Sequence, residues 1–149
     1  MNLLILGDIM GASGRKVLFN RLPDLIKTNK IDFVIVNGEN ACDDGKGITK
    51  EIAEELFKIG VDVITSGNHI WDKKETTDLI EKENRLLRPA NLVNGSPGKG
   101  YEIFFSKNKK FKVGVVNLMG NVFMRKTEDV FKTAKEISNK LKLKNIKLE

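Results

Sequence analysis

Three apolar runs, each followed at once by polar residues, constrain the fold of this sequence more than any other feature. The runs span residues 2–6, 33–37 and 61–65. Continuous runs rich in Val, Ile and Leu are typical of strands in a parallel sheet that is buried on both faces. Segments with helical spacing separate the runs, and right-handed crossovers then make the three strands parallel neighbours in one sheet. The sequence therefore predicts an α/β fold.

The polar residues that follow these runs carry the candidate chemistry. Asp8 follows the first run, Glu39 and Asn40 follow the second, and Asn68 and His69 follow the third. The carboxyl ends of parallel strands meet at one edge of a sheet, where α/β proteins bind ligands. Taken singly, each residue could be a loop cap. Taken together, they predict five functional side chains at one sheet edge.

The remainder of the sequence predicts further helices and a second set of strands. Pro23 lies inside the first helical segment and predicts a kink or a restart there. Residues 75–83 predict a short helix, and the alternation over 101–115 predicts a β-hairpin. Thr127 caps a last helix, after which the apolar spacing over 141–148 changes to two and predicts another strand. The architecture is thus expected to mix parallel and antiparallel strands.

Composition limits the classes of partner. With 40% hydrophobic and 31% charged residues, the chain is an ordinary globular protein, and its short apolar amino terminus predicts neither a signal peptide nor a membrane segment. We expect a cytoplasmic protein, and the single cysteine, Cys42, excludes an internal disulfide. The net charge is +6, with 12 Lys and Arg against 5 Asp and Glu in residues 101–149. Those lysines lack interleaved aromatic residues, so neither nucleic acid nor a membrane is an expected partner.

The side chains at the predicted edge match the ligands of a hard or borderline divalent metal. They offer carboxylate, carboxamide and imidazole groups and no thiolate. Two adjacent metals bridged by one carboxylate would polarise a phosphoryl group, lower the pKa of a bridging water and stabilise the charge of an in-line displacement. A histidine beside them is suited to protonate the leaving oxygen.

Three short motifs resemble those of a known superfamily. Gly7-Asp8, Gly38-Glu39-Asn40 and Gly67-Asn68-His69, in this order, resemble the first three motifs of the calcineurin-like metallophosphoesterases. The fuller strings resemble a bacterial branch that hydrolyses cyclic nucleotides, notably 2′,3′-cyclic AMP, at a di-iron or similar dinuclear centre. These strings are 7–11 with Gly14-Arg15, 37–40, 67–72 and 88–91. The resemblance covers about the first 120 residues, and Met10 and Glu39, which depart from the wider superfamily, agree with the branch.

The resemblance implies a fold, an activity and a role for each candidate residue. It implies a layered α/β/α metallophosphoesterase-like sandwich with mixed sheets, present here as its front half in one domain over residues 1–149. Asp8 and Asn40 would bind one metal, Glu39 would bridge both, Asn68 would bind the second, and His69 would donate a proton. The implied cofactors are two divalent metal ions, iron or manganese. The implied reaction is hydrolysis of a small phosphodiester or cyclic nucleotide by a metal-activated hydroxide.

The resemblance also implies histidine ligands from a later half of the chain. This sequence has no histidine after His69. We therefore interpret it as an amino-terminal fragment, incomplete at its carboxyl terminus. We expect these residues alone to bind metal weakly and to turn over slowly.

Two other classes of function remain open on the sequence. A dinucleotide-binding domain would use Gly7, Gly11 and Gly14 at the pyrophosphate and Glu39 at a ribose, but the spacing is wrong and Asp8 would repel the pyrophosphate. A non-catalytic remnant or interaction module would keep only the front of the fold. It predicts an exposed apolar sheet edge or groove, and hence a homo-oligomer.

Overall fold

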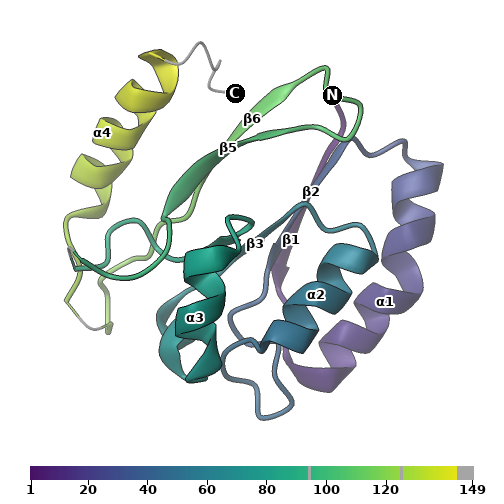
Figure 1. The fold of residues 1–149 in the computed structure, drawn as a ribbon, viewed down its shortest axis with the longest axis horizontal. Helices are drawn as coiled ribbons and strands as arrows, with labels where there is room; N and C mark the ends of the chain where they lie inside the picture. Colours follow the sequence, from purple (N-terminus) through teal and green to yellow (C-terminus); the bar gives the residue numbers. More distant parts are fainter. Residues whose placement is uncertain (94, 125, 144–149) are drawn as a thin grey trace.

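The computed structural model describes residues 1–93, 95–124 and 126–143, which form two sheets between layers of helices (Figure 1). Four parallel strands form the first sheet and two antiparallel strands form the second. The strands are β1 (Leu3–Asp8), β2 (Phe33–Asn37), β3 (Val63–Thr65), β4 (Leu86–Leu87), β5 (Tyr101–Phe105) and β6 (Lys112–Val116). The helices are α1 (Gly11–Thr28), α2 (Lys50–Lys58), the short η1 (Asn68–Trp71), α3 (Glu75–Lys82) and α4 (Val130–Leu143).

The order of layers confirms the predicted α/β sandwich. Helices α1, α2 and α3 cover one face of the parallel sheet, the hairpin β5–β6 covers the other, and α4 packs outside the hairpin (Figure 1). The parallel and antiparallel strands lie in separate sheets, so two sheets form the middle of the sandwich.

The main core lies between the helices and the parallel sheet. Leu22 of α1, Leu56 of α2 and Ile80 of α3 pack against Val34, Val36 and other buried strand residues, each at most 2% exposed. Burial of such side chains stabilises the fold by about 1.5–3 kcal/mol each. This layer therefore fixes the sheet whose edge carries the candidate residues.

A second core joins the two sheets. Phe33 of β2 is 1% exposed and packs beside Phe104 of β5, with ring centroids 6.1 Å apart. Val113 and Val115 of β6 complete this layer, because alternate residues of a strand face the same side. The alternation in the sequence thus correctly predicted the hairpin.

Helices α1 and α4 differ in detail from the sequence expectations. Pro23 lies inside a continuous α1, with neither a break nor a restart in the helix. At the other end of the chain, α4 extends to Leu143, so the predicted strand over 141–148 is wrong for residues 141–143. The remainder of that prediction falls outside the described residues. Amphipathic spacing continues through Ile137 and Leu141, both buried against the hairpin, which explains why the helix persists.

Strand β1 is the edge of the parallel sheet and leaves apolar side chains exposed. Leu3 and Ile5 are paired in register with Phe33 and Ile35, so they face the same side as the core between the two sheets. Leu3 is nevertheless 41% exposed and Ile5 is 64% exposed. The β5–β6 hairpin therefore leaves the β1 side of this face uncovered. Among the described residues, no helix has the length and hydrophobicity needed to cross a bilayer.

Candidate functional site

The first three strands end side by side, as the sequence predicted. Asp8 at the end of β1 pairs in register with Asn37 at the end of β2, and Asn37 pairs with Thr65 at the end of β3. The backbone continues this alignment beyond the strands, because the Gly38 amide donates to the Thr65 carbonyl oxygen at 2.9 Å. The segments carrying the five candidate residues therefore leave the sheet at the same edge.

Glu39 is held by its backbone and its carboxylate points across to the third strand end. Its amide donates to Asn37 Oδ1 at 2.9 Å, and its carbonyl oxygen accepts from the Gly47 amide at 2.6 Å. The carboxylate lies against Gly67, where an added Cβ would be 2.5 Å from the Glu39 Cδ and 2.7 Å from Oε1. Any side chain at position 67 would displace this carboxylate.

One oxygen of the Glu39 carboxylate is buried without a hydrogen-bond donor. Oε2 has no partner among the described residues and is shielded from solvent. Buried polar atoms in proteins are almost always hydrogen-bonded, and burying an unpaired carboxylate oxygen destabilises the folded state. The environment of Oε2 is therefore completed by a group that the described residues do not supply.

Asp8 and Asn40 form a hydrogen-bonded pair of candidate metal ligands at the same edge. Asn40 Nδ2 donates to Asp8 Oδ2 at 2.8 Å, and the Asn40 carbonyl oxygen accepts from the Gly11 amide at 2.9 Å. The start of α1 thus fixes the backbone of Asn40. Both side chains are partly or fully accessible, so they can turn toward a ligand without opening the core.

Glu39 and Asn68 share a pocket of about 340 Å³ beyond the strand ends. The structure therefore brings the four predicted metal ligands to one edge as two sets, Asp8 with Asn40 and Glu39 with Asn68. Two of the four are carboxamides. In the part of the chain that the structure describes, no three His, Cys, Asp or Glu side chains lie together as a metal-binding group.

His69 lies on η1 and is oriented by Asp72. Its Nδ1 lies 2.7 Å from Asp72 Oδ2, and an ionised carboxylate only accepts, so Nδ1 carries the proton and Nε2 is left available. The His69 side chain is 29% exposed and does not line the pocket of Glu39 and Asn68. Asp72 belongs to the sequence motif over residues 67–72, but the sequence analysis gave it no role. Its spacing of three residues from His69 is the signal that indicates their contact.

Asn117 is a site residue that the sequence analysis missed. It is 8% exposed, lines the pocket of Glu39, and donates from Nδ2 to the carbonyl oxygens of Ser66 at 2.7 Å and Leu87 at 3.0 Å. It therefore ties the ends of β3 and β4 together, just before Gly67. Asn117 directly follows β6, and a polar residue directly after a strand is the same sequence signal that identified the other candidates.

The loop over residues 41–47 is fixed by ionic contacts. Arg15 donates to the Ala41 carbonyl oxygen and to Asp43 Oδ1, the latter at 2.6 Å. Lys73 donates to Asp44 at 2.7 Å, and this hydrogen bond lowers the pKa of Asp44 and raises the pKa of Lys73. Burial raises the pKa of the Cys42 thiol, so it is not a reactive thiolate at neutral pH.

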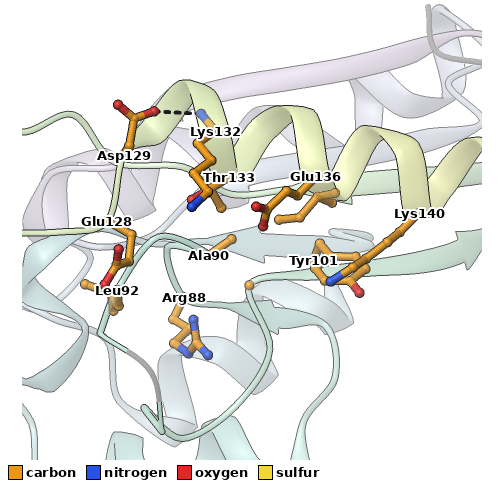
Figure 2. Close-up of a pocket in the computed structure, with 12 residues that line it drawn as sticks. Arg88, Ala90, Leu92, Tyr101, Glu128, Asp129, Lys132, Thr133, Glu136 and Lys140 are labelled. Carbon is orange, nitrogen blue, oxygen red and sulfur yellow. Dashed lines mark hydrogen bonds between the residues drawn. The ribbon is translucent and has the colours of Figure 1, made fainter.

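A separate pocket of about 330 Å³ lies between α4 and the segment after β4 (Figure 2). Arg88 lies across this pocket from Glu136 of α4, with its guanidinium directed away from that helix (Figure 2). The Arg88 guanidinium donates to the carbonyl oxygens of Pro89, Ser96 and Pro97, and burial lowers its pKa. The motif over residues 88–91 thus supports the loop over 96–100 and does not contribute Arg88 to the pocket of Glu39.

Comparison with known proteins places the chain in a family. The model of the family described as YmdB-like protein matches residues 4–148. The chain is similar to the 2′,3′-cyclic-nucleotide 2′-phosphodiesterase of Bacillus subtilis, with 42% identity over 137 residues, which is 92% of this chain and 51% of that protein.

Two solved structures are similar in fold and sequence. One is a hypothetical protein from Thermus thermophilus, with a TM-score of 0.83 and 34% identity over 92% of this chain and 52% of that one. The other is a novel phosphatase from Mycoplasma pneumoniae, with a TM-score of 0.82 and 35% identity over 93% and 50%. The chain spans about half the length of the relatives it matches. Because the family match extends over nearly every residue, the chain belongs to the YmdB-like protein family.

Proposed function

We propose that this chain provides the first part of a dinuclear-metal phosphodiesterase site that acts on cyclic nucleotides of the 2′,3′ type. The name of the Bacillus subtilis relative supports the substrate class. The observation that carries the metal site is the buried, unpartnered Oε2 of Glu39, held against Gly67. Asp8 and Asn40 would hold one ion, Glu39 would bridge both, and Asn68 would hold the second.

The donor set fits a hard or borderline divalent ion such as Mn²⁺ or Fe²⁺. It consists of carboxylate and carboxamide oxygens, which these cations prefer to soft ligands. A cation beside Glu39 would also neutralise an oxygen that no donor in the described residues satisfies. Cys42 is buried and protonated and is not part of this set.

Divalent ions bound here would supply Lewis acidity toward a phosphoryl oxygen and lower the pKa of a coordinated water. The protein's own residues orient the His69 ring and protonate the leaving oxygen. Asp72 holds the His69 ring through Nδ1, so that Nε2 is the nitrogen that exchanges a proton with the leaving oxygen. Asn117 donates to the Ser66 carbonyl oxygen and so fixes the backbone directly before Gly67. Because the Glu39 carboxylate lies against Gly67, this contact also fixes the space that the carboxylate occupies.

The proposal is tested by metal binding and by hydrolysis in the same preparation. Calorimetric titration of the metal-free chain with Mn²⁺ is expected to show weak binding that requires Asp8 and Glu39. Chromatography of reactions with 2′,3′-cyclic AMP is expected to show slow hydrolysis that stops when a chelator is added. A chain that binds no Mn²⁺ or Fe²⁺ at millimolar concentration would contradict the proposal.

His69→Gln is expected to separate proton transfer from metal binding. Loss of a general acid typically lowers the rate of hydrolysis by about 10²-fold or more. Because His69 lies outside the pocket of Glu39 and Asn68, the affinity for Mn²⁺ should stay within about twofold of the unmodified chain. A large loss of Mn²⁺ affinity in this variant would instead identify His69 as a metal ligand.

A second candidate function, an interaction module, is favoured by the uncovered face of β1. Ile5 is 64% exposed on the edge strand of the parallel sheet, and an apolar sheet edge of this kind promotes association. We propose that this face takes part in self-association. No observation favours the dinucleotide-binding alternative.

Ile5→Lys is expected to reduce self-association, because a charge on an edge strand opposes pairing with another chain. Sedimentation velocity over a range of concentrations measures the effect, with Val93→Lys as the matched control. Val93 is 63% exposed but lies in the loop between β4 and β5 and not on β1. Equal association of the two variants would exclude β1 as the contact.

A further inference from the structure

The pocket that contains Glu39 and Asn68 is lined by residues of two kinds. Asn37, Glu39, Asn68 and Asn117 are its polar residues. The segment that follows Asn117 contributes its apolar residues, and these are Leu118, Met119, Val122 and Met124. We name these four residues the apolar wall. A ligand in this pocket would therefore meet both polar groups and apolar surface.

The apolar wall is anchored to the fold from behind. Asn91 is fully buried; its Nδ2 donates to the Met119 carbonyl oxygen at 2.7 Å and its Oδ1 accepts from the Met119 amide at 3.0 Å. Farther along the segment, Thr127 donates from its hydroxyl to Asn121 Oδ1. A segment held by its neighbours at two points loses little entropy when a ligand binds. The wall is thus pre-organised for a ligand.

Two members of the wall remain open to solvent. Val122 is 78% exposed and Met124 is 36% exposed, although both line the pocket. Phe123 between them is fully exposed and does not line the pocket. Its φ of 58° is unusual for a bulky residue, and conformations of this kind concentrate at functional sites. Contact with a ligand would remove the exposed surface of Val122 and Met124 from water.

We infer that the apolar wall is the subsite for the base of a nucleotide phosphodiester whose phosphate lies toward Glu39 and Asn68. This inference rests on the proposed function. A nucleoside carries a base with a flat apolar face, and methionine and branched aliphatic side chains pack well on such a face. The pocket volume of about 340 Å³ falls in the range of small-molecule sites. Phosphodiesters without a base leave this wall uncovered and bind more weakly.

The test compares ligands with and without a base, using compounds that the proposed reaction does not consume. Calorimetry with Mn²⁺ present measures the dissociation constants of adenosine 3′-phosphate and ribose 3-phosphate. The unmodified chain is expected to bind the adenosine compound up to about tenfold more tightly, which is the upper end of the scale of contacts between methionine sulfur and an aromatic ring. In the double variant Val122→Thr with Met124→Gln, this preference should fall to within about twofold, with the affinity for ribose 3-phosphate unchanged.

Phe123→Ala is the matched control, because it removes a large exposed side chain from the same segment but not from the pocket. It should keep the preference of the unmodified chain, and thermal melting monitored by circular dichroism confirms that each variant folds. A preference that persists in the double variant, or is absent from the unmodified chain, overturns the base subsite and leaves the phosphodiesterase proposal standing. Binding of Mn²⁺ with no binding of either phosphate compound overturns the phosphodiesterase proposal itself. If the double variant changes only the sedimentation coefficient, the wall is a protein contact and the base subsite is excluded.

Discussion

Replacing Gly67 by alanine is expected to lower the affinity of the chain for Mn²⁺ by at least about tenfold, because the new methyl group occupies the place of the Glu39 carboxylate. Steric overlap is the direct cause, since an added Cβ would lie 2.5 Å from the Glu39 Cδ. The Glu39 carboxylate must then move away from the end of β3 and from Asn68. The same change should bring hydrolysis of 2′,3′-cyclic AMP below detection.

Gly7→Ala is the matched control for this substitution. Gly7 also lies at the end of a strand, directly before Asp8, but a Cβ added there meets nothing within 4 Å. Its Mn²⁺ affinity, measured by calorimetry, should stay within about twofold of the unmodified chain. Thermal melting of both variants separates a local change from loss of the fold. Wild-type Mn²⁺ affinity in Gly67→Ala would show that the position of Glu39 against Gly67 is irrelevant to metal binding.

Glu39→Gln is expected to change stability in opposite directions with and without metal. Without metal, the substitution removes a buried, unpartnered charge, so the free energy of unfolding should rise by on the order of 1 kcal/mol. With Mn²⁺ at 100 times its dissociation constant, the unmodified chain gains about 2.7 kcal/mol by mass action, whereas the variant, lacking the bridging carboxylate, gains little. The order of stability of the two proteins therefore reverses when Mn²⁺ is added.

Urea unfolding with and without Mn²⁺ measures this reversal. Glu55→Gln on the exposed side of α2 serves as the control, because it removes the same charge from a solvated position. It should change the free energy of unfolding by no more than about 0.5 kcal/mol in either condition. If Glu39→Gln lowers stability without metal, its carboxylate has a stabilising partner and the argument for a cation at Oε2 fails.

The edge that carries the site could be predicted from the sequence because it depends on local order along the chain. A parallel strand buried on both faces requires a continuous apolar run, and the first polar residue after the run must then lie at the carboxyl edge of the sheet. Asp8, Asn40 and Asn68 were located in this way, and the register of β1, β2 and β3 places their segments side by side. The helices and the hairpin followed from the same kind of periodicity.

Other features could not be predicted because they depend on contacts between distant residues. Pro23 predicted a kink or a restart, yet α1 continues through it, since Leu22 before it and Ile26 after it both pack in the core against the sheet and hold the helix in place. The two-residue strand β4 has too few residues to show a periodic pattern. The predicted strand over 141–148 was wrong at its start, because the buried Leu141 on the hairpin favours continuation of α4.

The order of apolar and polar residues by itself determined the α/β class of this protein and the edge of the sheet at which its functional side chains gather. Only the tertiary structure decided that the carboxylate of Glu39 lies on Gly67 with one oxygen unsatisfied, that Asn117 joins the ends of β3 and β4, and that the apolar wall lines the same pocket as Glu39 and Asn68. The physical reason is that strand periodicity is a property of neighbouring residues, whereas the burial of one oxygen atom is set by every segment packed around it.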